Sequence, residues 1–352
     1  MQAPSVGLDK PDILRALGPA EQYSTARSYL GIYNNVCVTA TYSNRHGREL
    51  RSALFSSLSA IIRKHPILSA VPVDVSSTTT HFVRLGQIEL DKIVTFVENK
   101  MHPPSESMTS HILDEVLIHE HNLPFKHDNP SIPLWRITIL FNPDDLSSFT
   151  LCLCFHHSIA DTQSALILHE DLGYELAAVE GNVPISAVVS TPKLELVPPL
   201  ESLVILPTSA DFIQMQRSLG EPSQNWWNGK RQSLPVATRF SSVWLSQALF
   251  GQLRAKCKEK SVSLTAGLIS LIAGAFFRLL PPEYTVIQGD CAVSLRRFLP
   301  DNTNTRSVGC YVGSLSESYH RNCFTVWGDA ARTKANIDKT ITGRGANTGY
   351  IV

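Results

Sequence analysis

Two adjacent histidines and an aspartate are the clearest chemical signal in the sequence. His156 and His157 follow the apolar run 149–155, and Asp161 comes four residues after the second histidine. Histidine titrates near neutral pH, so an imidazole held at the end of a strand is suited to act as a general base. A carboxylate in the next tight loop can fix the backbone and thereby the orientation of the ring. A fixed base of this kind accelerates attack by an alcohol by ~10²–10⁴-fold.

The spacing alone leaves three interpretations of these histidines open: a catalytic base, a satisfied core histidine, or a two-ligand metal site. A metal site needs further ligands, and His111, His119 and His121 cluster on what we expect to be a solvated helix. The seven cysteines are scattered without a CxxC pair, which argues against structural zinc and against a disulfide framework. Cys152 and Cys154, two residues apart, are expected to be small buried side chains on one face of a strand.

Composition restricts the class of protein. The chain has 352 residues, with 31 basic and 31 acidic residues. Charged residues make up 18% and apolar residues 43%, which excludes disordered and collagen-like classes. Zero net charge provides no field to attract nucleic acid, so none is expected as a partner.

The sequence also bears on location. Residues 1–10 have no apolar core of the kind found in a secretory signal, and the longest uncharged stretch, 261–277, reads as a core helix and not as a membrane span. We therefore expect a cytoplasmic protein without a transmembrane segment, with peripheral membrane association left open.

The elements around the histidines follow from hydrophobic periodicity. Apolar residues at helical spacing predict an amphipathic helix over 48–64. Short β-rich runs predict strands at 68–75 and 81–85. The runs 135–141 and 149–155 are separated by turn residues and predict an antiparallel hairpin, and 162–178 then has helical composition. The histidines thus fall in a short loop between a strand and a helix.

The second half of the chain has its own pattern. Five prolines between 181 and 208 indicate an extended connector, so we predict an N-terminal lobe at 1–180, the connector at 181–208 and a C-terminal lobe at 209–352. Expected elements are a strand at 238–245, helices at 247–260 and 263–280, the second buried, and strands at 284–295 and 308–315. The mixture indicates an α/β (α+β) fold and not a TIM barrel.

The segment 155–164 resembles the HHxxxDG signature of the acyl-CoA-dependent acyltransferase superfamily, which includes chloramphenicol acetyltransferase, plant BAHD enzymes and nonribosomal condensation domains. Further stretches are similar, in the same order, to fungal alcohol acetyltransferases. They are residues 15–23 and 30–36, Lys64-His65-Pro66-Ile67-Leu68, Pro133-Leu134-Trp135-Arg136, Pro198-Pro199-Leu200-Glu201, 263–266, 294–297 and 308–312.

This resemblance implies two chloramphenicol-acetyltransferase-like lobes with the active site in a tunnel between them. It implies that His157 is the general base and that Asp161 has a structural role in an ion pair, with Arg296 or Arg297 as the partner. Acetyl-CoA or another acyl-CoA would be a co-substrate, with no bound cofactor and no metal. The acceptor would be a small alcohol, an amine or a secondary metabolite, and the protein is expected to be a monomer.

Two departures from the family pattern support a second hypothesis. Thr162 stands where the family has glycine, and a β-branched residue is strained there if the backbone needs a positive φ. The aspartate-phenylalanine-glycine-tryptophan-glycine element of the plant enzymes does not occur, and the chain is shorter than is usual in the family, so a truncated second lobe is expected. The alternative function is a catalytically impaired relative that keeps the fold for binding or assembly.

Overall fold

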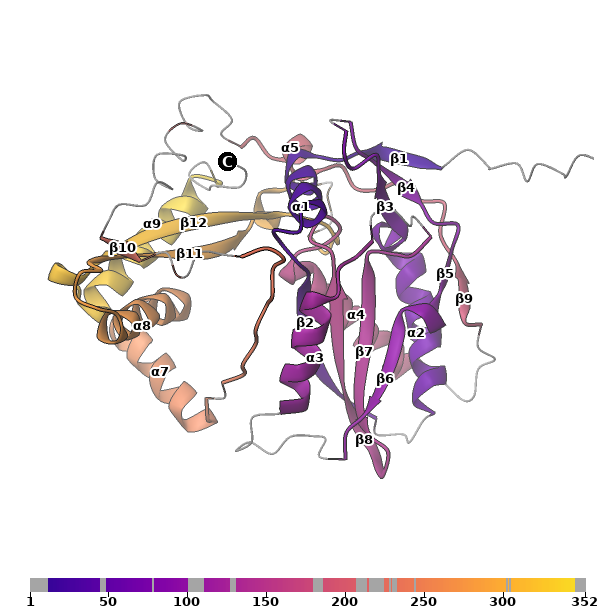
Figure 1. The fold of residues 1–352 in the computed structure, drawn as a ribbon, viewed down its shortest axis with the longest axis horizontal. Coiled ribbons are helices and arrows are strands. Elements are labelled where there is room, and N and C mark those ends of the chain that lie inside the picture. The colour runs from indigo at the N-terminus through magenta and orange to yellow at the C-terminus, as the bar shows by residue number, and fades with distance from the viewer. Residues whose placement is uncertain are drawn as a thin grey trace, which may run out of the picture.

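Two groups of sheets and helices meet along a seam in the computed structural model (Figure 1). The structure describes residues 12–44, 49–77, 79–100, 111–126, 131–179, 186–206, 225–227, 233–243, 245–301 and 305–345, together with residues 214, 229 and 303. The fold is α/β (α+β), as predicted. Both lobes combine sheets with helices.

The first lobe is built on a four-stranded sheet in the order β2-β8-β7-β6. Only β6 and β7 run parallel, and β7 and β8 form the predicted hairpin. The strands are β2 (Val36–Ser43), β6 (Val94–Glu98), β7 (Trp135–Asn142) and β8 (Asp145–Phe155). The helices around them are α1 (Pro19–Tyr29), α2 (Leu50–Lys64), α3 (His111–Asn122) and α4 (Thr162–Ala178).

Alternation along β7 and β8 assigns one sheet face to each helix layer. Ile137 and Leu153 line a small apolar cavity together with side chains of α2 and α4. The next residues along the same strands face the opposite way, so Thr138 and Cys154 contact Glu120 of α3. Cys152 and Cys154 are fully buried free thiols, which confirms the prediction for them.

Two small sheets complete the first lobe. One has the order β1-β4-β3 and the other pairs β5 with β9. Their strands are β1 (Ile13–Ala16), β3 (Ala70–Val73), β4 (His81–Arg84), β5 (Gln87–Glu89) and β9 (Val188–Ser190).

The described part of the predicted connector, 186–206, includes β9, which pairs with β5 of the first lobe, and has no regular secondary structure over 191–199. After β9 it leads to the short helix α5 (Leu200–Leu203), whose Leu200 packs with Leu295 and Tyr311 of the second lobe. Residues 181–185, 207 and 208 lie outside the described ranges, and the boundaries of the two lobes remain a prediction.

The second lobe has a three-stranded sheet in the order β10-β11-β12 with helices against it. Tyr319 of β12 is fully buried among apolar side chains of α8, and its hydroxyl lies 2.8 Å from Thr333 Oγ1 of α9. The elements are β10 (Trp226–Trp227), α7 (Gln247–Glu259), α8 (Leu264–Leu279), β11 (Val286–Ser294), β12 (Val312–His320) and α9 (Val326–Thr342).

Three expectations for the second half were wrong in detail. No strand forms over 238–243, because Asn122 of α3 hydrogen-bonds the Thr238 backbone and Asp114 that of Ser242, so side chains replace a ladder. Helix α8 is buried on one face only and leaves Ile272 54% and Leu279 81% exposed. The last predicted strand begins four residues late, since the preceding segment, 308–311, bonds the motif loop instead.

Among the described residues, no single helix is both long and apolar enough to cross a bilayer. Helices α7 and α8 meet that test only when taken together, across a bend of 105°.

Candidate active site

The paired histidines occupy the loop between β8 and α4, and the two side chains have different surroundings. His156 is 1% exposed, and its Nδ1 accepts a hydrogen bond from the Ser158 backbone at 3.1 Å. The ring also packs edge-on against Phe125. His156 therefore matches the core-histidine interpretation, and His157 alone carries the question of catalysis.

His157 is partly buried at the seam between the lobes. Its Nδ1 lies 3.7 Å from the thiol of Cys310, which belongs to the second lobe, and its ring lies 6.1 Å from that of Tyr33. Its own backbone carbonyl also acts on the ring and favours the protonated form. Either ring nitrogen of a neutral imidazole can carry the proton, and in the tautomer with the proton on Nδ1 the Nε2 lone pair can accept one.

Burial is the main reason that the pKa of His157 lies below its ordinary value. The bond to its carbonyl and the charge of Asp161 raise that pKa, and the charge of Arg27 lowers it further. The imidazole is therefore neutral at neutral pH and able to accept a proton.

Asp161 ties the motif loop to the second lobe. Its Oδ1 caps helix α4 by accepting from the Ser164 backbone at 2.8 Å, and its Oδ2 accepts from Arg296 at 2.7 Å and from the Tyr311 backbone at 2.9 Å. This carboxylate makes no hydrogen bond to His157, because Ser164, Arg296 and Tyr311 occupy both of its oxygens. The carboxylate can thus hold the loop in place, but it is not aimed at the imidazole.

Of the two candidate arginines, the structure brings Arg296 to Asp161. The side chains of this pair are 5% and 4% exposed, so the ion pair is buried. Arg296 also donates to the Ser164 hydroxyl at 2.6 Å and to the Gly309 carbonyl at 3.2 Å. Arg297, the next residue, is exposed.

Thr162 occupies the position of the family glycine without backbone strain. It is the first residue of α4, its side chain is exposed, and it is not among the described residues with positive φ. The strain considered from the sequence does not arise, because Asp161 already has the extended backbone of an N-cap and the helix starts directly after it.

Two other stretches that resemble the family pattern, 15–23 and 198–201, contact each other. Gly18 begins α1 next to Pro199 of the connector, and a Cβ on Gly18 would lie 2.4 Å from the Cβ of Pro199. Glu201 accepts a hydrogen bond from the backbone of Ala20 at 2.7 Å. A side chain at position 18 would clash with Pro199, so this close approach requires glycine.

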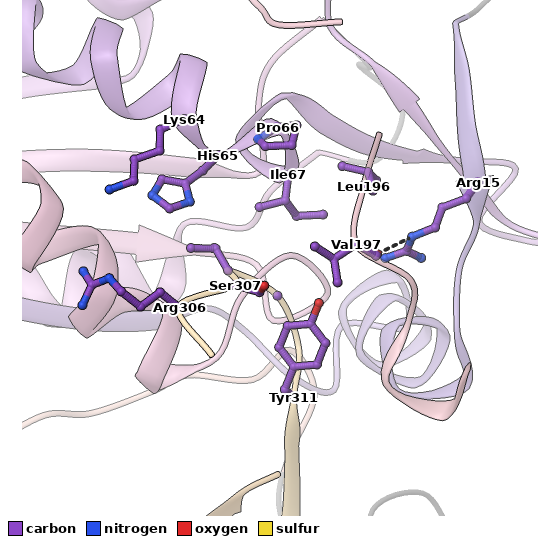
Figure 2. A pocket seen from close by; sticks show the side chains of 12 residues that line it. Arg15, Lys64, His65, Pro66, Ile67, Leu196, Val197, Arg306, Ser307 and Tyr311 are labelled. Carbon is purple, nitrogen blue, oxygen red and sulfur yellow. Dashed lines mark hydrogen bonds between the residues drawn. The ribbon is translucent and has the colours of Figure 1, made fainter. Parts of the chain in front are cut away.

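A pocket of about 260 Å³ opens at the seam beside the motif (Figure 2). The Tyr311 ring rises into it between the lobes, with Lys64 and Arg306 on one side and Arg15 on the other. Its cations are matched by carboxylates: Asp171 lies 2.9 Å from Lys64 and 2.7 Å from Arg306. His157 does not line this pocket, although both adjoin the segment 308–311.

The other histidines singled out from the sequence form no metal site. His119 is exposed, His121 stacks against Phe240, and the side chain of His111 lies outside the described residues. Within the described part of the chain, no group of three or more His, Cys, Asp or Glu side chains is arranged to hold a metal ion.

Sequence reasoning missed several groups around His157. Cys310 and Ser164 belong to recognised stretches, but nothing in their spacing assigned them a contact. Arg27 follows Tyr23 by four residues on α1. Side chains at this spacing lie together on a helix, so the spacing could have predicted the contact between Arg27 and the Tyr23 ring.

A family model described as alcohol acetyltransferase matches residues 16–322, which is most of the chain. The chain belongs to the alcohol acetyltransferase family. This agrees with the resemblance drawn from the motif stretches.

Two relatives of this alcohol acetyltransferase family member carry the same description. The probable alcohol acetyltransferase crmB of Aspergillus fumigatus is 29% identical over 312 residues, covering 85% of this chain and 66% of the relative. The probable alcohol acetyltransferase FCK4 of Fusarium pseudograminearum is 23% identical over 324 residues, covering 83% and 63%. The chain thus spans about two thirds of the length of these relatives.

Solved structures support the fold. Polyketide synthase associated protein 5 from Mycobacterium tuberculosis is 14% identical with a TM-score of 0.62, covering 97% of this chain and 77% of that one. The first condensation domain of the calcium-dependent antibiotic synthetase, in complex with a substrate analogue, is 10% identical with a TM-score of 0.65, covering 95% and 77%. At these identities the similarity concerns the fold alone.

Proposed function

We propose that the protein transfers an acyl group, most simply acetyl, from acyl-CoA to the hydroxyl group of a small alcohol, with His157 as the general base. The observation that carries the proposal is the position of His157, an imidazole at the seam of two lobes whose Nδ1 lies 3.7 Å from the Cys310 thiol and whose pKa is lowered by burial. The family assignment supports the class of reaction. An amine acceptor remains the alternative outcome of the assay.

In the proposed reaction, the alcohol oxygen attacks the thioester carbonyl carbon while Nε2 of His157 takes the hydroxyl proton. The tetrahedral oxyanion collapses, the carbon–sulfur bond breaks, and the imidazolium returns the proton to the CoA thiolate. The products are an ester and free CoA. The cysteines need take no part, and burial in any case raises the pKa of the Cys310 thiol well above its usual range, which disfavours a thiolate there.

Asp161 and Arg296 are positioning residues in this proposal. They fix the start of α4 and the loop that precedes it, and they join that loop to the segment carrying Cys310. Because both lobes contribute contacts to the imidazole, this buried pair would preserve its placement between the two substrates.

The test is CoA release from acetyl-CoA with a panel of alcohols and amines, with the acetylated product identified by mass spectrometry. The wild-type protein should turn over, and His157→Ala should lower kcat by about 100-fold or more. The matched control, His119→Ala on the exposed part of α3, should keep wild-type activity. A loss below about tenfold in His157→Ala would show that His157 is not the base. No turnover by folded wild-type protein would favour the catalytically impaired relative.

A further inference from the structure

The guanidinium of Arg27 lies over the ring of Tyr33, and that ring lies near the imidazole of His157. Arg27, in the last turn of α1, has its guanidinium carbon 4.3 Å from the Tyr23 ring centroid and 4.0 Å from that of Tyr33. The Tyr33 ring is in turn 6.1 Å from the His157 ring. The guanidinium carbon therefore lies no farther from the His157 ring centroid than the sum of the 4.0 Å and 6.1 Å distances. The positive charge of Arg27 lowers the pKa of His157.

This guanidinium has no counter-ion among the residues that the structure describes. Its Nε is buried without a hydrogen-bond partner, and no described carboxylate forms an ion pair with it. Asp161, the acid whose charge acts on His157, is already neutralised by Arg296. Among the described residues, a positive charge beside the proposed base thus has no acidic partner.

Local structure explains only part of this arrangement. The C-terminal end of α1 favours a cation, and the Tyr23 and Tyr33 rings stabilise a guanidinium stacked between them. Neither effect satisfies the buried Nε–H donor, and a buried donor without a partner costs free energy.

We propose that Arg27 binds a carboxylate of the acyl acceptor, so that the preferred acceptor is a hydroxy acid. This inference rests on the proposed function. A guanidinium presents parallel N–H donors that match the two oxygens of a carboxylate. The separation from His157 leaves room for a few carbon–carbon bonds between the carboxylate and the hydroxyl group that His157 deprotonates.

The phosphates of CoA share this anionic chemistry but fit the position less well. The pantetheine arm places more than a dozen bonds between the thioester sulfur and the diphosphate. An extended arm would carry the phosphates well past Arg27 when the thioester is at His157. The acceptor carboxylate is therefore the source that the geometry favours.

The test compares a charged and an uncharged acceptor of the same chain length, ω-hydroxyhexanoate and its methyl ester, with acetyl-CoA as the donor. The wild-type protein should have a higher kcat/KM for the acid, and Arg27→Met should lower the acid-to-ester ratio by about tenfold or more, mainly through KM of the acid. Arg27→Lys should restore part of the ratio. Arg254→Met, an exposed cation on α7, serves as the matched control and should leave the ratio unchanged.

A second donor separates the two sources of the anion. Acetyl-N-acetylcysteamine has the thioester but no phosphate, and the same fall in the acid-to-ester ratio is expected with it. If Arg27→Met instead raises only KM for acetyl-CoA, the guanidinium binds a CoA phosphate, and the inference is overturned.

The remaining outcomes separate this inference from the proposed function. An unchanged acid-to-ester ratio in Arg27→Met, with turnover that still depends on His157, would overturn the inference and leave the acyltransferase proposal standing. No acetylation of any acceptor by folded wild-type protein would overturn both.

Discussion

Two arginines flank the motif loop, and their surroundings are opposite. Arg296 is buried and bonded at all three guanidinium nitrogens, with Asp161, Ser164 and backbone carbonyls as the acceptors. Arg27 lies between two tyrosine rings with a buried Nε that has no partner. A satisfied network can only hold structure, whereas an unsatisfied cation beside the proposed base is able to bind a substrate. The contrast supports the proposed positioning role of Arg296 and the proposed recognition role of Arg27.

The largest effect is expected from breaking the buried pair. Arg296→Met leaves the Asp161 carboxylate buried without its cation, which should lower the free energy of unfolding by about 3–5 kcal/mol. Chemical denaturation measures this loss. Arg297→Met, the exposed neighbour, should change it by less than about 0.5 kcal/mol. Equal losses in the two variants would contradict the distinction between these arginines.

The unpaired cation should act on pH dependence more than on stability. Asp161, the backbone carbonyl of His157, and Arg27 all influence the imidazole, and Arg27 opposes its protonation. Arg27→Met should therefore raise the pKa of His157, so that the neutral base is lost at a higher pH. We expect the acidic limb of the kcat/KM profile to move upward by up to about one pH unit.

The control for this pH profile is a variant that keeps the charge at position 27. Arg27→Lys keeps the positive charge and should keep the limb near its wild-type position. The wild-type limb itself should lie below the ordinary histidine value of about 6.5, because burial lowers the pKa of His157. A limb that stays in place in Arg27→Met would show that the charge of Arg27 does not reach the imidazole, and a limb that moves downward would contradict the direction of its effect.

The smallest effect is expected at a second ion pair across the seam. Arg306 bonds Glu170 and Asp171, but its side chain is 43% exposed, and Asp171 would keep Lys64 and His65 as partners. Arg306→Met should lower the free energy of unfolding by about 1 kcal/mol or less. A loss as large as that of Arg296→Met would mean that the exposed contacts join the lobes as firmly as the buried pair.

Much of the first lobe was predictable because its signals are local. Hydrophobic periodicity located α2, and turn residues located the β7–β8 hairpin. Helix α4 has the predicted bounds, since Asp161 supplies an N-cap at its start. The second lobe was harder. Residues 238–243 have strand composition, yet their backbone is bonded by side chains of α3, which no local pattern reveals.

For the site, the sequence by itself determined the motif, the family and the histidine to propose as base, because the residue types and their spacing can be read directly from the short segment 155–164. The sequence could not distinguish Arg296 from Arg297, since the two are adjacent residues of the same type. Only the tertiary structure chose Arg296, by turning that side chain inward to a carboxylate 135 positions away. Arg27 emerged in the same way. The recognition role proposed for it depends on a buried Nε without a partner among the described residues, which is a property of packing in three dimensions.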